Sequence, residues 1–282
     1  MSVPALTGGH LLADVRDADP SPRLLHIWWL GQSGFLLAHR GRRLMLDPYL
    51  SDSLTRKYAG TDRPHTRVSD IVVAPETLGF VDAVTASHAH TDHLDPETLG
   101  PLLKAAPEAR LVAPAAHRAL ALERARIPPM RLVELDDGVT AEVAGFQIEG
   151  VPAAHEAIER DEAGRMRHLG YVVTAGPLRV YHAGDTVQYP GIADRVGPVD
   201  VALLPINGRD PARGVAGNMD GEEAALVAAE LPAAIAVPCH YGTFAFNTAS
   251  PDGFVAACER RGVRHAVLRA GERFTVPGRG EP

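Results

Sequence analysis

The chain has 282 residues, enough for one large α/β domain or two small ones, and its 45% hydrophobic and 22% charged residues are typical of a globular protein with a full core. Lys and Arg number 28 against 35 acidic residues, and the net charge of −7 argues against nucleic acid as a partner. The two cysteines, the lack of a signal-peptide pattern and the lack of an apolar run of ~20 residues predict a cytoplasmic protein without a membrane partner.

Short apolar runs separated by glycine turns predict a meander of strands in the first part of the chain. We interpret residues 1–24 as an N-terminal extension and expect strands at residues 25–30, 35–38, 44–46 and 82–87. Two helices follow at residues 96–106 and 114–126; the first has a proline at its start, and Pro107 stops it.

The second part of the chain repeats this order of strands followed by helices. The expected strands are residues 131–135, 139–143, 146–151, 169–174, 178–182, 199–204 and 234–237, and the expected helices are residues 221–231 and 254–261. Asp220 and Glu223 form a capping-box pattern at the start of the first of these helices, and two further strands close the chain. We therefore predict a single α/β domain over residues 25–282, in which two sheets pack face to face with helices outside.

Residues 87–93 read Ser-His-Ala-His-Thr-Asp-His and are the most informative stretch of the chain. On an extended segment His88 and His90 point the same way, whereas Asp92 and His93 turn away, so that one segment can serve two adjacent metal ions. A solvated polar loop is the alternative interpretation. Three imidazoles and a carboxylate directly after a buried strand favour a metal site.

Three more residues of ligand type follow apolar runs, where loops project functional groups from a rigid sheet. They are His155, Asp185 and His240. Each alone is more typical of an ordinary loop, but with the cluster they make five histidines and two aspartates, enough for two divalent ions. Imidazole and carboxylate donors suit zinc or manganese, and iron as well.

Other side chains are candidates for substrate contacts. Arg209, in a glycine-rich loop, offers a fork that matches a carboxylate or phosphate, although a solvated loop is an equal alternative. Tyr241 could donate a hydrogen bond to a leaving group or an oxyanion, and Gln32 is a similar candidate in its turn. His182, three residues before Asp185, is either a partner of the site or a satisfied sheet histidine.

The order of these motifs resembles the metallo-β-lactamase superfamily. The segments WWLGQSGF, SHAHTDHLD, YHAGDT and VPCHYGTF are moreover similar to the L-ascorbate 6-phosphate lactonase group and related zinc-dependent hydrolases of the β-lactamase fold. The resemblance extends over about residues 25–276 and implies a four-layer αββα sandwich, the metallo-β-lactamase fold.

The resemblance also implies roles for the predicted ligands. It assigns His88, His90 and His155 to one metal, Asp92, His93 and His240 to the other, and Asp185 to a bridge between the two. Asp92 and Asp185 are then the catalytic carboxylates: Asp92 orients the attacking hydroxide, and Asp185 holds the two cations together.

Hydrolysis of a small-molecule lactone, ester or amide, anionic substrates included, is the leading functional hypothesis. The alternative is a phosphodiesterase acting on a lipid headgroup or a nucleotide, since one fold serves both chemistries. A third hypothesis is a non-catalytic metal-binding protein, although none of the seven ligand positions is missing. The sequence leaves the oligomeric state open, a homo-oligomer included.

Overall fold

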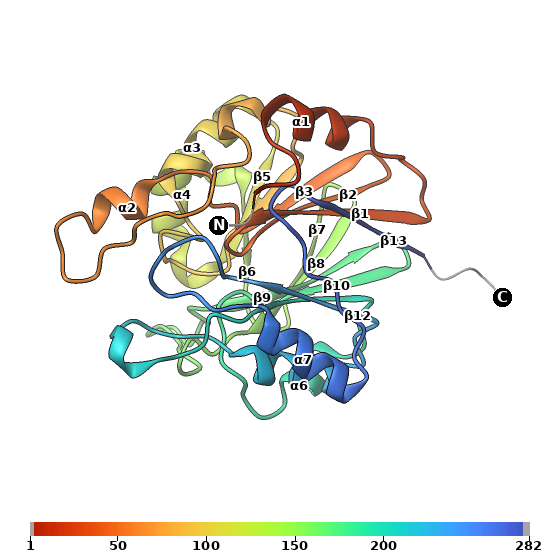
Figure 1. Ribbon diagram of the computed structural model, residues 1–282. Helices are drawn as coiled ribbons and strands as arrows, with labels where there is room; N and C mark the ends of the chain where they lie inside the picture. The colour runs from red at the N-terminus through yellow and green to blue at the C-terminus, as the bar shows by residue number, and fades with distance from the viewer. Residues whose placement is uncertain (1–2, 279–282) are drawn as a thin grey trace.

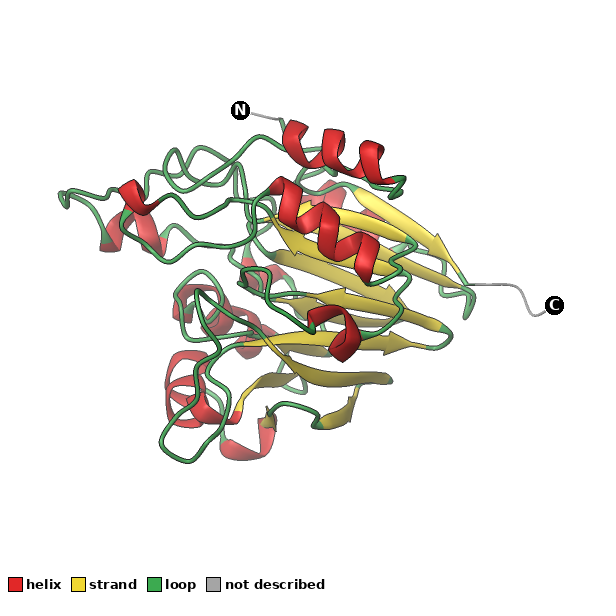
Figure 2. Ribbon diagram, turned by 90° about the horizontal axis from the view of Figure 1, so that it is seen from below, coloured by secondary structure: helices red, strands yellow, loops and turns green. Residues whose placement is uncertain are grey.

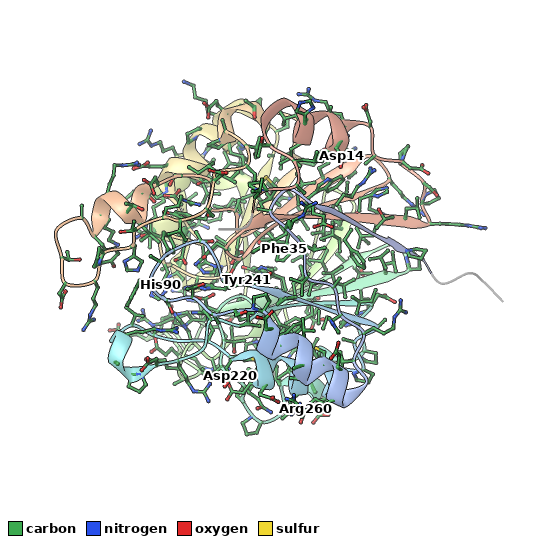
Figure 3. The ribbon with its side chains drawn as sticks, viewed as in Figure 1. Asp14, Phe35, His90, Asp220, Tyr241 and Arg260 are labelled. Carbon is green, nitrogen blue, oxygen red and sulfur yellow. The ribbon has the colours of Figure 1, made fainter. Side chains whose placement is uncertain are left out.

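The computed structural model describes residues 3–278 and contains two β-sheets packed face to face, with helices on both outer faces (Figure 1). Figure 3 places Asp14 and Arg260 on opposite outer helices, with the buried Phe35 between them. The predicted αββα sandwich is confirmed.

The first sheet has seven strands in the order β13-β1-β2-β3-β4-β5-β6. Its strands are β1 (Leu24–Gly31), β2 (Gly34–His39), β3 (Arg42–Leu46), β4 (Ala83–Thr85), β5 (Arg110–Pro114), β6 (Leu132–Leu135) and β13 (Arg273–Pro277). Strands β3 to β6 run parallel to one another, so their carboxyl ends meet at the same edge of the sheet.

The second sheet has six strands in the order β12-β11-β10-β9-β8-β7. They are β7 (Thr140–Val143), β8 (Phe146–Pro152), β9 (Leu169–Ala175), β10 (Leu178–His182), β11 (Val201–Pro205) and β12 (Ile235–Cys239). Strands β10, β11 and β12 are parallel and fully or largely buried, as expected for strands covered on both faces.

Three helices cover the first sheet: α1 (Gly8–Arg16), α3 (Pro96–Ala105) and α4 (Arg118–Ala125). The second sheet is covered by α5 (Ile192–Val196), α6 (Gly221–Glu230) and α7 (Asp252–Arg261), and the short α2 (Ser53–Lys57) projects beyond the edge of the sandwich. In the part of the chain that the structure describes, no helix has the length and apolar character needed to cross a bilayer.

Two apolar clusters hold these layers together. The larger fills the space between the sheets and continues under α5, α6 and α7, and the smaller lies between the first sheet and α1, α3 and α4. The predicted capping box is present at α6, where the Asp220 side chain accepts from the Glu223 amide and the Glu223 side chain accepts in return. Its two reciprocal bonds satisfy amides that would otherwise be unpaired at the start of the helix.

Several elements differ from the prediction. Residues 110–114 form β5, so α4 begins at Arg118, four residues later than expected, because this short apolar run pairs with β4 instead of joining the alanine-rich helix. Helices α1, α2 and α5 were not predicted: α1 lies in the segment interpreted as an extension, and α2 and α5 have only five residues each. After α7 the described residues contain one full strand, β13, while His265 makes only an isolated bridge to Ala236.

Helix α1 lies in the segment interpreted as an extension, yet it packs on the core. Leu11 and Val15 are each 2% exposed, and the indole of Trp28 in β1 donates to Asp14 at 2.8 Å. The helix therefore covers apolar surface of the first sheet.

We predict that Leu11→Ala lowers the free energy of unfolding by about 2–4 kcal/mol, because it leaves a cavity between α1 and the first sheet. His10→Ala, at an exposed position of the same helix, is the control and should change it by less than about 0.5 kcal/mol. Urea unfolding of the metal-free protein measures both. Equal stability of the Leu11 variant and the wild type would mean that α1 is a dispensable extension.

Candidate metal centre

The predicted ligands lie beyond the carboxyl ends of strands from both sheets. His88, His90, Asp92 and His93 follow β4, whereas His155, Asp185 and His240 follow β8, β10 and β12. Figure 2 shows long loops projecting beyond one end of the strands. Because the two sheets are stacked, the loops of the first sheet face those of the second, and residues up to 152 positions apart (His88 and His240) enter one site.

The seven side chains form two groups, in each of which one donor atom per residue lies within 4.8 Å of all the others. The first group is His88, His90, His155 and Asp185, and the second is Asp92, His93 and His240. In the first group His155 Nε2 lies 3.2 Å from His90 Nδ1. In the second, His240 Nε2 lies 3.5 Å from Asp92 Oδ2. The structure thus brings all seven predicted residues together, in the division that the resemblance implies.

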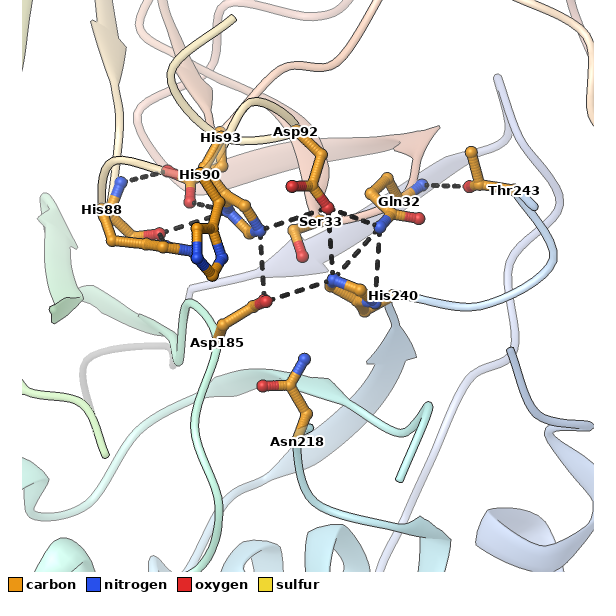
Figure 4. A network of polar contacts seen from close by, with 12 residues as sticks. Gln32, Ser33, His88, His90, Asp92, His93, Asp185, Asn218, His240 and Thr243 are labelled. Carbon is orange, nitrogen blue, oxygen red and sulfur yellow. Dashed lines mark hydrogen bonds and ion pairs between the residues drawn. The ribbon is translucent and has the colours of Figure 1, made fainter. Parts of the chain in front are cut away.

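Asp185 belongs to the first group and also contacts the second, through His93 and His240 (Figure 4). One carboxylate oxygen lies 3.2 Å from His93 Nε2, and the other lies 3.2 Å from His240 Nε2 and 3.9 Å from His155 Nε2. This is the position that a shared ligand requires.

The chemistry of the donors fits bound cations. His88 Nε2, His93 Nε2 and Asp185 Oδ1 are buried and make no hydrogen bond of ordinary geometry with the described residues. Burial lowers the pKa of His88 well below its usual value, so this imidazole is neutral and has a free lone pair. Buried nitrogen and oxygen atoms without partners are costly, and coordination of a metal ion would satisfy them.

The neighbouring carboxylates raise the pKa of two other histidines, His240 and His93. Burial by itself would lower the pKa of His240, but the neighbouring Asp185 outweighs it and raises the pKa to about 9. The same balance of burial against Asp185 and Asp92 raises the pKa of His93 well above its usual value. In the metal-free chain these imidazoles hold protons as counter-charges, which again indicates a site designed for positive charge.

Asp47 is a site residue that the sequence analysis missed. It follows β3, is fully buried, and its carboxylate accepts from His93 Nδ1 at 2.7 Å and from the Ser87 amide at 3.0 Å. This bond fixes the proton on Nδ1 and turns Nε2 of His93 toward Asp185. A signal was present, since Asp47 stands directly after an apolar strand like the other site residues.

The backbone is locally strained where strands turn into the site. Gln32, Asp47 and His240 have left-handed backbone angles, with φ of 51°, 41° and 59°. Such conformations are uncommon for residues other than glycine and cluster at functional sites. Gly184 has φ of 62°, and a Cβ there would meet the Leu169 carbonyl oxygen at 2.7 Å, so only glycine lets the chain turn to present Asp185.

The loop that carries the histidine cluster is held on both sides. Asp95 caps α3 and accepts from the hydroxyls of Ser51 and Ser53, at 2.7 and 3.0 Å. From the other side Arg124 of α4 donates to the carbonyls of Ala89 and Leu94. The ligands are therefore pre-positioned by hydrogen bonds outside the site.

Five of the seven donors line a cavity of about 510 Å³: His90, Asp92, His155, Asp185 and His240. Of the three predicted substrate contacts, the structure brings Gln32 to this cavity, where its amide donates to Asp92 at 2.8 Å. Tyr241 and Arg209 are absent from the described lining of the cavity. Tyr241 is buried and stacks on Trp29, because its ring fills the core beneath the site.

Arg209 and His182 both bind partners elsewhere in the fold. Arg209 forms an ion pair with Glu223 of α6, so its guanidinium already has a carboxylate partner and does not face the cavity. His182 is fully buried and bonds through Nε2 to the Ser33 carbonyl at 2.8 Å, which makes it a sheet histidine beneath the site.

Comparison with known proteins agrees with this geometry. The profile of the family described as "Beta-lactamase superfamily domain" matches residues 42–241. The chain belongs to this superfamily. The predicted membership is confirmed, whereas the finer similarity to the L-ascorbate 6-phosphate lactonase group stays a prediction.

Individual relatives extend the match over most of the chain. A protein of Azorhizobium caulinodans named "UPF0173 metal-dependent hydrolase" is 28% identical, with 89% of this chain and 100% of that protein covered. The uncharacterized protein Mb0930 of Mycobacterium bovis is 31% identical, with 90% of this chain and 69% of that protein covered. The metallo-β-lactamase fold protein YhfI of Bacillus subtilis shares the fold, with a TM-score of 0.66 and 16% identity over 90% of this chain and 100% of that chain.

We predict that Asp47→Asn weakens metal binding about 10–100-fold while the protein remains folded, because an amide group no longer fixes the proton on Nδ1 of His93. Titration against a chelator measures the affinity, and circular dichroism checks the fold. Asp82→Asn is the matched control, because Asp82 accepts from Arg43 before β4, at the other end of that strand from the histidine cluster. Equal losses in both variants would contradict a specific role for Asp47.

We also predict that metal affinity rises with pH and levels off above about 9, since His240, whose pKa is raised to about 9, must lose its proton to become a ligand. The sign for the fold is opposite. The folded pKa exceeds the unfolded value of about 6.5, so this proton stabilises the metal-free fold fully below about pH 6.5, and that stability is lost as pH rises through 9. Chelator competition and apo-protein melting across this range measure both; an affinity that is flat with pH would contradict the protonated state.

Proposed function

We propose that the protein is a hydrolase that depends on two divalent metal ions and acts on a small-molecule lactone, ester or amide. The observation that carries the proposal is the pair of adjacent donor groups, both contacted by Asp185, at a cavity of about 510 Å³. A volume of a few hundred Å³ suits a small substrate. The name of the Azorhizobium relative, a metal-dependent hydrolase, agrees with this class of reaction.

The donors define where the ions would be held. His88, His90 and His155 would hold one ion, Asp92, His93 and His240 the other, and Asp185 would be shared. Zinc and manganese are the ions that suit this mixture of imidazole and carboxylate. When bound, such ions lower the pKa of a water toward neutrality and polarise the carbonyl oxygen of a substrate.

Asp92 is the carboxylate best placed to handle the proton of the attacking water. It lines the cavity, and its Oδ2 accepts from the Gln32 amide at 2.8 Å, which fixes the orientation of the carboxylate. In the reaction the water oxygen adds to the acyl carbon, the bond from carbon to the leaving oxygen or nitrogen breaks, and Asp92 carries the water proton to the leaving atom. Asp185 is 4% exposed, and its role would instead be that of a ligand shared by the two donor groups.

The direct test compares metal-free protein with protein replenished with zinc or manganese in hydrolysis of lactones, carboxylic esters, amides and phosphodiesters. We expect two bound ions per chain by elemental analysis and metal-dependent cleavage of an acyl bond. Cleavage of phosphodiesters alone would replace the proposal with the alternative function, and bound metal without any hydrolysis would support a non-catalytic role.

We predict that Asp185→Asn reduces the hydrolysis rate by at least about a hundredfold, because an amide is a poor shared ligand and the reacting groups are misplaced by an ångström or so. Asp194→Asn, at an exposed position of α5, serves as the control and should retain full rate. Rates are measured at saturating metal, with bound metal determined in parallel. Full activity of the Asp185 variant would refute its role as a shared ligand.

A further inference from the structure

Three cations of the cavity wall come from separate parts of the chain. Lys57 ends α2, Arg63 belongs to the loop that follows α2, and Arg124 belongs to α4 on the first sheet. None of the three forms an ion pair with another described residue of the chain. Arginines elsewhere on the surface are commonly paired, as Arg56 is with Glu97 and Arg260 with Glu222.

Two of these cations lie directly against the loop of metal ligands. The Lys57 ammonium is 3.3 Å from the hydroxyl of Thr91, the residue between His90 and Asp92. Arg124 donates through one nitrogen, Nη1, to the Ala89 carbonyl at 2.6 Å. The same nitrogen also donates to the Leu94 carbonyl, so Nε and Nη2 make no hydrogen bond with the described residues, and the side chain borders the cavity. Charged donors are therefore held beside the reaction centre without a partner of opposite charge.

Arg63 reaches the cavity from its far side. Its guanidinium donates to the Gly214 carbonyl, so the loop after α2 meets the loop after β11, and both residues line the cavity. Figure 1 shows α2 and its loop projecting on the same side as the loop that follows β11. The third cation is therefore an exposed residue of the cavity wall.

Negative charge in the cavity is confined to the metal ligands. Asp92 and Asp185 are the only acidic side chains in its described lining. The rest of the wall near α2 is aromatic, with Tyr58 stacked on His65 at 4.3 Å, and burial lowers the pKa of His65, so that it is neutral at pH 7. A protein with a net charge of −7 therefore gathers three unpaired cations where a substrate must enter.

We propose that this cavity selects substrates that carry an anionic group, a carboxylate or a phosphate, in addition to the bond that is cleaved, and that Lys57, Arg63 and Arg124 bind this group. The inference rests on the proposed hydrolase function and names its substrate class. Arginine forks and a lysine ammonium are the usual protein partners of such anions, and unpaired cations in a cleft also attract them from solution. The sequence analysis expected an anion contact from Arg209; the structure assigns it to these three residues instead.

The test uses three open-chain sugar acids that have no acyl bond to cleave: gluconate, glucarate with a second carboxylate, and 6-phosphogluconate with a phosphate. Isothermal titration calorimetry gives their affinities for the metal-loaded full chain. We expect the second anionic group to improve binding about tenfold at low salt and less at high salt, because Lys57 and Arg63 are exposed to solvent. A gain for glucarate alone or for 6-phosphogluconate alone supports the proposal and names the group.

The variants are Lys57→Gln, Lys57→Gln combined with Arg63→Gln, and Arg124→Lys, which keeps the charge but not the fork. In the double variant the gain from the second anion should fall to about twofold or less, with bound metal unchanged. Arg56→Gln is the matched control: Arg56 is exposed on the same helix, pairs with Glu97 and does not line the cavity, so the gain should persist. The single Lys57 variant keeps the test informative if loss of Arg63 loosens the loop.

Three outcomes would overturn the proposal: no gain from a second anion in the wild type, a gain that survives in the double variant, or equal losses in the double variant and in Arg56→Gln. Parallel assays with the corresponding lactones separate this inference from the proposed function. Absence of metal-dependent hydrolysis of lactones, esters and amides together with the expected binding pattern would remove the hydrolase while leaving the anion site in place.

Discussion

The structure depends on one constraint, which is that five imidazoles and two carboxylates, most of them buried, converge beyond the carboxyl ends of strands from both sheets. His88 Nε2, His93 Nε2 and Asp185 Oδ1 are buried there without a hydrogen-bond partner among the described residues, which is unfavourable unless a positive charge satisfies them. The chain meets this demand with cations, and its metal-free form shows the same need as protons on His93 and His240. The remaining features of the site follow from the need to hold these donors in place.

The two sheets hold the backbone of the donor residues rigid, and the turns that follow the strands set the orientation of the donor side chains. Each donor follows a strand of the buried sandwich, so its backbone is fixed on one side by ladder hydrogen bonds. The strained backbone at Asp47 and His240 and the obligatory glycine at position 184 aim the side chains inward. The cost of this strain is offset by a core that runs without interruption beneath the site.

The cavity lining combines two kinds of charged residue. Its acidic lining residues are Asp92 and Asp185 of the donor set, whereas the wall formed by α2 and α4 carries cations without a partner of opposite charge. Membership of a superfamily that serves many chemistries does not determine the substrate. The wall that we propose as the determinant of substrate choice consists of loops, of the short α2 and of part of α4.

The sequence by itself predicted the layered fold and singled out the seven donor residues that the structure brings together, because both predictions depend on local patterns. Strand periodicity and the HxHxDH spacing are legible within a few residues, and every ligand stands directly after an apolar run. What only the tertiary structure decided are contacts between segments distant in the chain: the reach of Asp185 into both groups, the bond from Asp47 to His93, and the meeting of Lys57, Arg63 and Arg124 at one cavity. Arg209 illustrates the difference. Its glycine-rich loop suggested an anion contact, but its guanidinium forms an ion pair with Glu223 of α6. No local pattern records which partner a long charged side chain will find, since that depends on how the layers stack.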